Sequence, residues 1–488
     1  MKRKQRHIWI LCMVFIFSLL LSACSSTSSS TQENTVSSQA PFGRVSVATD
    51  AFPDSSTTPD TQPQDDAPDE SAAPVLNTVT LADSRSFSEG IAWVQYYDNA
   101  RNLQFGWLHP DGSIDQPFPV ERVTTFGSDF SGGYSYVTTG DGYVHQKTDI
   151  PDSFIILDQS GAVTAESPND GSSYEILCGG NGVYLVKQSI RSMTESEDRY
   201  GFITADGDWL YECTVCKIDG THPLSALGVV EFRSENNIQY SYLGENVFLA
   251  RYDERQSVLY NCRTNQTYRI TGKNQDVVIY DNYSDGYIPV KIDGTLYILS
   301  TGFDLQPISV DAATSVCYSD GIIYATEYMW GMGATGKGGK FYLLDGSVLA
   351  DLTGYELLYQ YAEDLFRFRD GYAAVIIYGL DKEYYLGIIN LNGMFAFEPL
   401  KFDLGFYTED QFGELSSGRF ACKISNQEEG SQNAEVVVVD TSGNVTHSDY
   451  FGSKNAGRLI FHESFAWDQT IQCFLKDDGT VLETYLKR

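Results

Sequence analysis

Positive charge and histidine are scarce in this 488-residue chain. It carries 33 Lys and Arg against 65 Asp and Glu, which gives a formal net charge of −32. A surface with this charge repels nucleic-acid phosphates and anionic lipid headgroups, so nucleic acid is excluded as a partner. Only six histidines occur, and those after His7 show no metal-binding spacing such as His-x-x-x-His. The sequence therefore predicts no metal site.

Common catalytic motifs are also lacking. No Gly-x-Ser-x-Gly motif is present, which argues against a hydrolase of that kind. The segment from Gly331 to Lys337 has the spacing of a phosphate-binding loop, but Gly338 stands where a magnesium-binding Ser or Thr belongs. This segment also precedes a predicted strand instead of opening a helix. We interpret it as a hairpin loop and expect no catalytic residue and no cofactor.

The nine cysteines form no disulfide framework. Cys213 and Cys216 have metal or redox spacing, with His222 nearby, but there is no second pair at zinc-finger distance. On a strand, side chains three residues apart face opposite sides of the sheet, which disfavours a shared metal. We interpret the pair as half-buried thiols, with a disulfide or a metal as alternatives.

Two acidic pairs are candidates for calcium ligands. They are Asp477 with Asp478, and Asp206 with Asp208. Aspartate is common in turns because its side chain accepts hydrogen bonds from nearby backbone amides, so turn formation is the favoured interpretation and calcium binding the alternative.

A second long apolar run is absent, and the first one is short. Four basic residues in positions 2 to 6 precede an apolar segment from Ile8 to Ala23, which is shorter than the roughly 20 residues that a spanning helix needs. This arrangement predicts an export signal that is removed. Its loss lowers the net charge by four, from −32 to −36.

The end of this signal resembles the lipobox of bacterial lipoproteins. The matching residues are Leu21-Ser22-Ala23-Cys24. The resemblance implies that residues 1–23 are a signal peptide and that the mature protein begins at Cys24, whose thiol carries a diacylglycerol. It places the chain on the extracytoplasmic face of the cell membrane, with the bilayer as a partner of the Cys24 lipid. Cleavage without lipidation and an uncleaved anchor are the alternatives.

Residues 24–75 are rich in Ser, Thr, Pro, Asp and Gln and poor in large apolar side chains. Such a segment cannot bury enough apolar surface to offset the entropy of ordering, so we predict a disordered tether between the membrane and the following domain.

Residues 76–488 have the composition of an all-β domain. The chain contains 32 Tyr, 27 Phe and 43 Gly but only 15 Pro, and it shows no sustained helical periodicity. Short β-runs ending in polar-Gly turns recur about every 46 residues, because Gly302, Gly346, Gly393 and Gly443 lie 44, 47 and 50 residues apart. One interval, from Gly207 to Gly302, spans two units, and a degenerate hairpin near Asn261 to Asn265 could fill it.

A second repeated element is an aromatic residue followed, after two intervening residues, by glycine. Its copies are Phe87 to Gly90, Phe130 to Gly133, Tyr283 to Gly286, Tyr318 to Gly321, Phe368 to Gly371 and, with Leu in place of the aromatic, Leu415 to Gly418.

Together the two elements resemble the WG-repeat family of bacterial proteins. The best copies are Phe87, Gly90, Ala92 and Val94 followed by Gly106 and Gly112, then Tyr200, Gly201 and Gly207, and then Phe368, Gly371, Ala373 and Val375 followed by Gly387 and Gly393. The family's Trp is Phe105, Tyr200 or Leu386 here, and several units lack the central Gly. The resemblance implies a repeat-built, extracytoplasmic binding protein.

We therefore predict a β-propeller of seven or eight blades, with a β-solenoid or two β domains as alternatives. Each repeat needs neighbours to bury its aromatic face, and closing a ring removes exposed sheet edges. We expect the run from Cys473 to Leu486 to complete the first blade. The predicted function is a non-enzymatic binding module for an envelope protein, a peptide or a glycan. The alternatives are a glycan- or peptide-active enzyme and an accessory subunit for envelope assembly or transport.

The tryptophans offer one candidate contact site. Trp93, Trp107, Trp209 and Trp467 lie in predicted strands and are expected in the core. By contrast, Trp330 and its neighbour Tyr328 lie beside a glycine-rich loop, where packing explains them less well, so we predict that they contact a ligand.

Replacing the lipobox cysteine tests the anchor. Cys24→Ser removes the thiol that the lipid needs, so we expect the variant to lose metabolically incorporated fatty acid and to change its detergent extraction from membranes. Cys12→Ser, within the same signal, is the matched control and should keep both properties. A Cys24→Ser protein that is still labelled and extracted like the wild type would contradict the lipobox assignment.

Overall fold

A computed structural model describes the chain in residues 78–139, 152–191, 196–214, 239–253, 256–270, 277–279, 286–310, 315–327, 335–359, 365–402, 413–425, 434–451, 456 and 459–487. The chain divides into two units, residues 1–73 and residues 74–488, and all described residues belong to the second. The predicted signal peptide, Cys24 and the tether lie outside the described residues.

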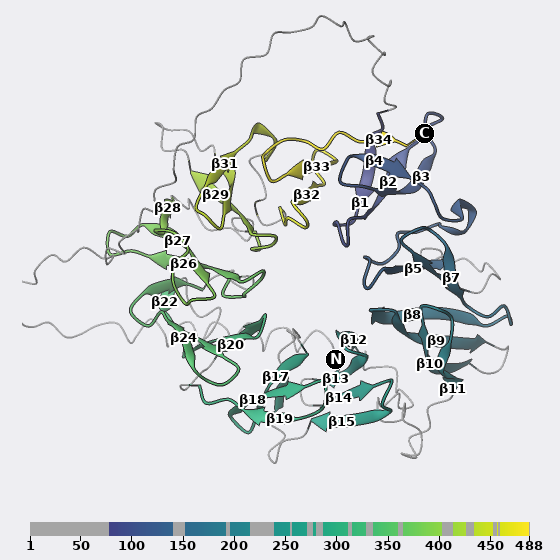
Figure 1. Ribbon diagram of the computed structural model, residues 1–488, viewed down its shortest axis with the longest axis horizontal. Coiled ribbons are helices and arrows are strands. Elements are labelled where there is room, and N and C mark those ends of the chain that lie inside the picture. The colour runs from purple at the N-terminus through teal and green to yellow at the C-terminus, as the bar shows by residue number, and fades with distance from the viewer. Residues whose placement is uncertain are drawn as a thin grey trace, which may run out of the picture. The chain divides into compact units, whose positions relative to one another are not determined.

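The described part of the chain is almost entirely β-structure (Figure 1). Its strands are rich in aromatic and β-branched residues, which fit a pleated and buried surface. Two single-turn 3-10 helices, η1 (Val120–Arg122) and η2 (Asp449–Phe451), are the helical elements found there. Neither is long and apolar enough to cross a membrane.

Within the described residues the strands form eight sheets of three to five strands and one sheet of two strands. We number the eight larger sheets as blades 1 to 8 in chain order. Blade 1 contains β1 (Leu81–Ser84), β2 (Ala92–Tyr97), β3 (Leu103–Leu108), β4 (Ser113–Asp115) and β34 (Tyr485–Leu486). Blade 2 contains β5 (Tyr134–Thr139), β6 (Ser153–Asp158) and β7 (Val163–Glu166). Blade 3 contains β8 (Ser173–Gly180), β9 (Val183–Arg191), β10 (Ser196–Thr204) and β11 (Trp209–Thr214). Blade 4 contains β12 (Gln239–Gly244), β13 (Val247–Asp253), β14 (Gln256–Asn261) and β15 (Gln266–Ile270).

The remaining blades follow the same antiparallel plan. Blade 5 contains β16 (Val277–Ile279), β17 (Tyr287–Ile292), β18 (Thr295–Ser300) and β19 (Leu305–Pro307). Blade 6 contains β20 (Ser315–Ser319), β21 (Ile322–Thr326), β23 (Lys340–Leu343) and β24 (Val348–Asp351). Blade 7 contains β22 (Thr335–Lys337), β25 (Glu356–Leu358), β26 (Tyr372–Tyr378), β27 (Tyr384–Asn390) and β28 (Leu400–Phe402). Blade 8 contains β29 (Arg419–Ser425), β30 (Ala434–Asp440) and β31 (Val445–His447). The two-stranded closing sheet contains β32 (Phe465–Asp468) and β33 (Cys473–Lys476).

Hydrophobic cores lie between consecutive sheets. In β2, Trp93 belongs to a core shared with blade 2, whereas Ala92 and Val94 belong to one shared with the closing sheet. In β6, Ile155 packs towards blade 1 and Ile156 towards blade 3. Successive side chains of a strand point to opposite faces, so each central strand contributes to two cores. Each sheet therefore depends on both of its neighbours.

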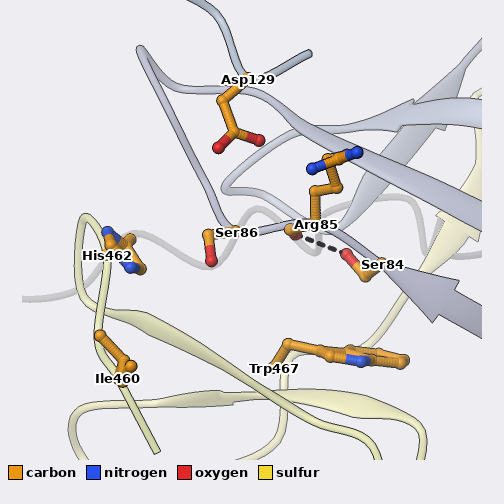
Figure 2. Close-up of a pocket in the computed structure, with 7 residues that line it drawn as sticks. All are labelled: Ser84, Arg85, Ser86, Asp129, Ile460, His462 and Trp467. Carbon is orange, nitrogen blue, oxygen red and sulfur yellow. Dashed lines mark hydrogen bonds between the residues drawn. The ribbon is translucent and has the colours of Figure 1, made fainter. Parts of the chain in front are cut away.

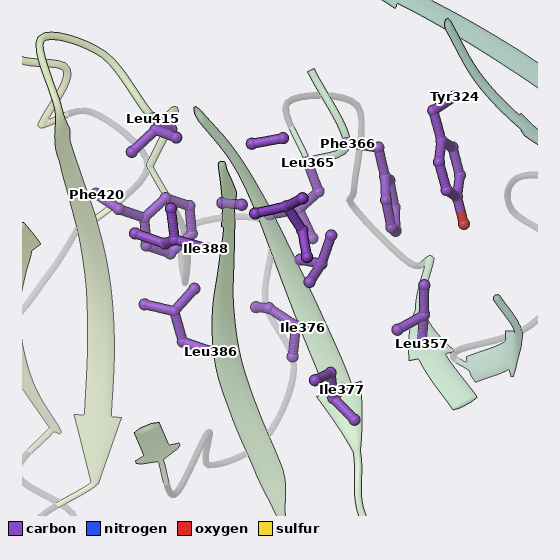
Figure 3. Close-up of a cluster of buried hydrophobic side chains, with 14 of the residues drawn as sticks. Tyr324, Leu357, Leu365, Phe366, Ile376, Ile377, Leu386, Ile388, Leu415 and Phe420 are labelled. Carbon is purple, nitrogen blue, oxygen red and sulfur yellow. The ribbon is translucent and has the colours of Figure 1, made fainter. Parts of the chain in front are cut away.

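The largest core joins blades 6, 7 and 8 (Figure 3). Tyr324 of blade 6 stacks on Phe366, with ring centroids 4.4 Å apart, while Ile376 and Leu386 of blade 7 lie between this stack and Phe420 of blade 8. All five side chains are buried. Burying an aliphatic or aromatic side chain of this kind contributes roughly 1.5 to 3 kcal/mol, so the three blades stabilise one another.

The C-terminal strand closes the structure onto its first blade. β34 pairs in parallel with β4, and the amides of Tyr485 and Lys487 donate to the carbonyls of Gly112 and Ile114 at 2.9 and 2.8 Å. The closing sheet shares one core with blade 8 and another with blade 1. The series of hydrophobic cores between neighbouring sheets thus runs from blade 1 round to the closing sheet and back to blade 1.

This arrangement confirms the predicted all-β propeller, with eight blades of three or more strands and the closing sheet in addition. The degenerate hairpin predicted near Asn261 is the β14–β15 connection of blade 4. The expected role of the C-terminal run needs one correction. β34 does complete blade 1, but Cys473–Lys476 pairs with β32 in the closing sheet, and from there Phe474 packs into the core shared with blade 1.

The repeated aromatic-x-x-Gly element is a tight turn that opens a long strand. In blade 7, Arg369 and Tyr372 exchange both backbone hydrogen bonds, at 2.8 and 3.0 Å, across Asp370 and Gly371. These two central residues have φ values of 52° and 82°. Positive φ at both positions is the signature of a type I′ turn, and glycine adopts it without steric cost.

Some of the many acidic residues are aspartates that form hydrogen bonds within the hairpin turns. Asp158, Asp345 and Asp478 each accept a hydrogen bond from the hydroxyl two residues later, at 2.6, 2.5 and 2.6 Å, and each also accepts one from a backbone amide. These hydroxyl hydrogen bonds hold the pKa of the three carboxyls below its ordinary value. The aspartates therefore stabilise the turns in their ionised form.

A substitution at Gly371 tests whether the repeated glycine is structural. Gly371→Val places a β-branched residue at a φ of 82°, and the new Cβ also meets Leu391 Cδ1 at 3.2 Å. We expect the free energy of unfolding to fall by about 1 to 3 kcal/mol in denaturant titrations. Gly354→Val is the matched control, because Gly354 lies in a turn without left-handed φ and with no atom within 4 Å of an added Cβ. Equal stability of the two variants would contradict a structural role for the repeated turn.

Candidate functional site

A pocket of about 330 Å³ lies where blade 1, blade 2 and the closing sheet meet (Figure 2). We call it the inter-blade pocket. Residues from three separate parts of the chain surround it, and they are Ser84, Arg85, Ser86, Asp129, Ile460, His462 and Trp467. Ser84 ends β1, and Trp467 lies in β32.

Three tight turns hold the pocket's loops in place. They are Ser88–Ile91 in blade 1, Ser131–Tyr134 in blade 2 and His462–Phe465 before β32. Reciprocal backbone hydrogen bonds close the first and third turns, and in the second the amide of Ser131 donates to the carbonyl of Tyr134 at 2.9 Å. Asp129 lies just before the second turn, and His462 is the first residue of the third. The repeated turn therefore positions Asp129 in blade 2 and His462 beside the closing sheet, the two sheets on either side of blade 1.

Side chains of these turns tie neighbouring sheets together. The amide of Gly90 donates to Glu463 Oε2 at 2.8 Å, which joins blade 1 to the closing sheet. Glu89 accepts hydrogen bonds from the amides of Gly132 and Gly133 at 2.6 and 2.8 Å, which joins blade 1 to blade 2. Hydrogen bonds to ionised groups are stronger than those between neutral groups, so this network fixes the spacing of the pocket walls.

Trp467 forms one wall of the pocket. It is only partly buried, and its ring contacts the buried Phe474 at a centroid distance of 5.2 Å. Figure 2 shows the indole along one side of the pocket and the Asp129 carboxylate on the opposite side, with Ser86 and His462 between these levels. The expectation that Trp467 belongs to the core therefore holds in part: its ring packs against the core that blade 1 shares with the closing sheet, but it is only half-buried.

The charged groups around the pocket are of both signs. Asp129 and Arg85 are exposed, and the Arg85 guanidinium lies over the Phe126 ring at 5.9 Å from its centroid. Burial lowers the pKa of His462, and Arg369 acts in the same direction, while the charges of Asp129 and Glu463 oppose the shift. The imidazole is therefore mainly neutral at pH 7, and it offers one donor and one acceptor nitrogen.

The structure leaves the predicted ligand contacts untested. Cys24, Tyr328 and Trp330 all lie outside the described residues, as do residues 331–334 of the glycine-rich segment. The rest of that segment, Thr335–Lys337, is not a loop but the strand β22, which pairs with β25. Trp93 and Trp107 are buried in one core, as expected, and Trp209 is half-buried against blade 2.

The other sequence candidates have different outcomes. Cys213 lies in β11, whereas Cys216 and His222 lie outside the described residues. Asp477 pairs with Arg419 at 2.9 Å, and Asp478 forms the turn described above. In the described part of the chain, no group of three or more His, Cys, Asp or Glu side chains is placed to hold a metal ion.

Sequence reasoning missed the pocket residues Arg85, Asp129 and His462. One signal was available for His462. The run from Phe461 to Phe465 is a further copy of the aromatic-x-x-Gly element, in which Ser464 replaces the glycine and still adopts a positive φ of 73°. Alignment of this copy with Phe87 to Gly90 would have placed His462 at the position of Ser88.

Comparisons with known proteins find likeness only in solved structures. No protein-family model matches the chain, and no curated protein matches it. An uncharacterized protein from Listeria monocytogenes is 8% identical, with 85% of this chain and 96% of that chain covered at a TM-score of 0.34. BamB from Moraxella catarrhalis is 13% identical, and the match covers 75% of this chain and 98% of that chain at a TM-score of 0.28. An oligogalacturonate lyase in complex with manganese is 9% identical, and the match covers 74% of this chain and 89% of that chain at a TM-score of 0.31.

Titration of His462 tests the electrostatics of the pocket. Because the folded-state pKa is lowered, we expect the imidazole to titrate below its ordinary value of about 6.5 in histidine-selective NMR spectra. The linked contribution to stability is present above pH 6.5 and is lost as pH falls through the folded-state pKa. Asp129→Asn removes a charge that raises this pKa, so it should lower the pKa further. An unchanged or raised value in Asp129→Asn would contradict the expected stabilisation of the protonated His462 by Asp129.

Proposed function

We propose that this chain is a membrane-anchored, extracytoplasmic binding lipoprotein whose propeller holds its ligand in the inter-blade pocket without chemical conversion. The lipobox ending in Cys24 supports the location. The eight-bladed fold is compatible with a binding role but does not specify one, because one fold serves many functions.

The lining of the inter-blade pocket is the observation that carries the proposal. One aromatic wall, one aliphatic side chain and several groups that donate or accept hydrogen bonds surround a volume of about 330 Å³. This value lies at the low end of the roughly 300 to 1,000 Å³ that small-molecule sites occupy. Concave sites with a mostly fixed shape and a few convergent polar groups are typical of ligand recognition.

A hydrolase acting on glycans or peptides is the second candidate. One observation favours it: Asp129 and His462 line the same pocket and interact electrostatically. A carboxylate and an imidazole can act as general acid and base when a substrate lies within hydrogen-bonding reach of both. The two candidates differ in whether the ligand leaves the pocket unchanged.

Retention of envelope material tests the proposal. The full-length protein, inserted through its lipid into vesicles, is incubated with an envelope extract from the cells that produce it, and the retained material is analysed by mass spectrometry. We expect the double variant Asp129→Asn/Trp467→Ala to retain less by about tenfold or more, since each lost contact weakens binding. Tyr97→Ala, which removes an exposed aromatic of blade 1 outside the pocket, is the matched control.

Each outcome separates the candidates. Specific retention of a ligand with unaltered mass supports a binding protein. Cleavage of the retained material by the wild type, but not by Asp129→Asn, would replace this proposal with the hydrolase. Equal retention by the wild type and the double variant would show that the inter-blade pocket is not the binding site.

A further inference from the structure

The uncovered part of the Trp467 ring suggests what kind of ligand the pocket takes. The indole packs against the fully buried Phe474 ring at an interplanar angle of 53°, at the edge of the core that blade 1 shares with the closing sheet. Figure 2 shows the ring extending along the pocket wall beneath Ser84 and Ser86. A flat, rigid aromatic surface of this kind favours a ring-shaped ligand with an apolar face.

The polar groups opposite this wall match hydroxyl groups. Among the described residues, no hydrogen bond to the Asp129 carboxylate is found, so its oxygens are available as acceptors. Ser86 can both donate and accept, and a neutral His462 offers one donor and one acceptor. A sugar hydroxyl also donates and accepts, so neighbouring hydroxyls on one ring can satisfy all three groups.

Charge around the pocket disfavours an acidic ligand. Glu89 and Glu463 lie in the turns that frame the pocket, Asp129 lines it, and the whole chain carries a net charge of −32. The Arg85 guanidinium is the cation among the lining residues, and it lies over Phe126. Repulsion by the surrounding carboxylates therefore favours neutral ligands over anionic ones.

The pocket size and its exposed rim limit how much of a ligand is enclosed. A volume of about 330 Å³ suits one ring with its substituents. Arg85, Ser86 and Asp129 are exposed, so the pocket is open to solvent and a longer chain can continue outwards.

We infer that the inter-blade pocket binds one neutral pyranose residue of a glycan chain, which stacks on Trp467 and hydrogen-bonds to Asp129 and His462. This inference rests on the proposed binding function and specifies its ligand class. Trp467 supplies the apolar contact, and the two polar side chains on the other walls select the orientation of the ring.

Oligosaccharide titration tests the inference. The probes are cellohexaose, maltohexaose, laminarihexaose and chitohexaose, with hexagalacturonate as the acidic comparison. The full-length protein is kept in a detergent without a sugar headgroup, and binding is followed by calorimetry and by tryptophan fluorescence. We expect saturable binding of at least one neutral probe and weaker binding of hexagalacturonate.

Variants show whether the pocket is responsible. Trp467→Ala and Asp129→Asn should each weaken binding of the neutral probe by about tenfold or more, the range expected for loss of a stacking or charge-assisted contact. Trp467→Phe keeps an aromatic ring against Phe474 and should retain most of the affinity, which separates loss of stacking from loss of folding. Tyr97→Ala should bind like the wild type.

Three outcomes would overturn the inference. These are no binding of any neutral probe, tighter binding of hexagalacturonate, or unchanged binding by Trp467→Ala. If neutral probes fail while envelope material is still retained by the wild type and lost in the double variant, the binding function stands and the sugar assignment is wrong.

Discussion

Burial of both faces of every sheet is the constraint on which this structure depends. A sheet of three or four short strands exposes two apolar faces, and each face is covered only by the next sheet. The alternation in β2 and β6 shows this directly, since adjacent residues of one strand enter different cores. Stability of this kind is shared along the repeat array, and a sheet at an open end would leave one face in water.

Closure removes that open end. The closing sheet supplies Phe474 to the core of blade 1 and Leu475 to a core shared with blade 8, and β34 then adds to β4. The backbone carbonyl of Glu483, just before β34, lies close to Gly112. A Cβ atom at position 112 would collide with this carbonyl oxygen, so the close approach requires glycine. The last residues of the described chain thus complete the first blade, which makes the two ends of the domain interdependent.

The same closure creates the inter-blade pocket. Its walls come from residues near 85, near 129 and near 465, which meet only because the closing sheet lies beside blade 1. The turn hydrogen bonds of Glu89 and Glu463 then fix the distances between these walls. A rigid site reduces the entropy lost on binding, which suits recognition of a ligand that offers few strong contacts.

The sequence by itself determined the fold class, the repeat length and the turns. Apolar alternation, Asp-Gly and Ser-Gly turns and the aromatic-x-x-Gly spacing are local patterns, and the backbone conformation at Gly371 follows from local sterics. The exported location and the lipid at Cys24 are predictions of the same local kind.

Only the tertiary structure decided where the candidate site lies. His462 and Asp129 are ordinary polar residues beside repeated turns, and Trp467 has the pattern of a core residue in a strand. Their roles depend on which sheets become neighbours and on the half-buried position that Trp467 takes where the closing sheet packs against blade 1. Pairing of segments more than 300 residues apart is a property of ring closure, and no local pattern encodes it.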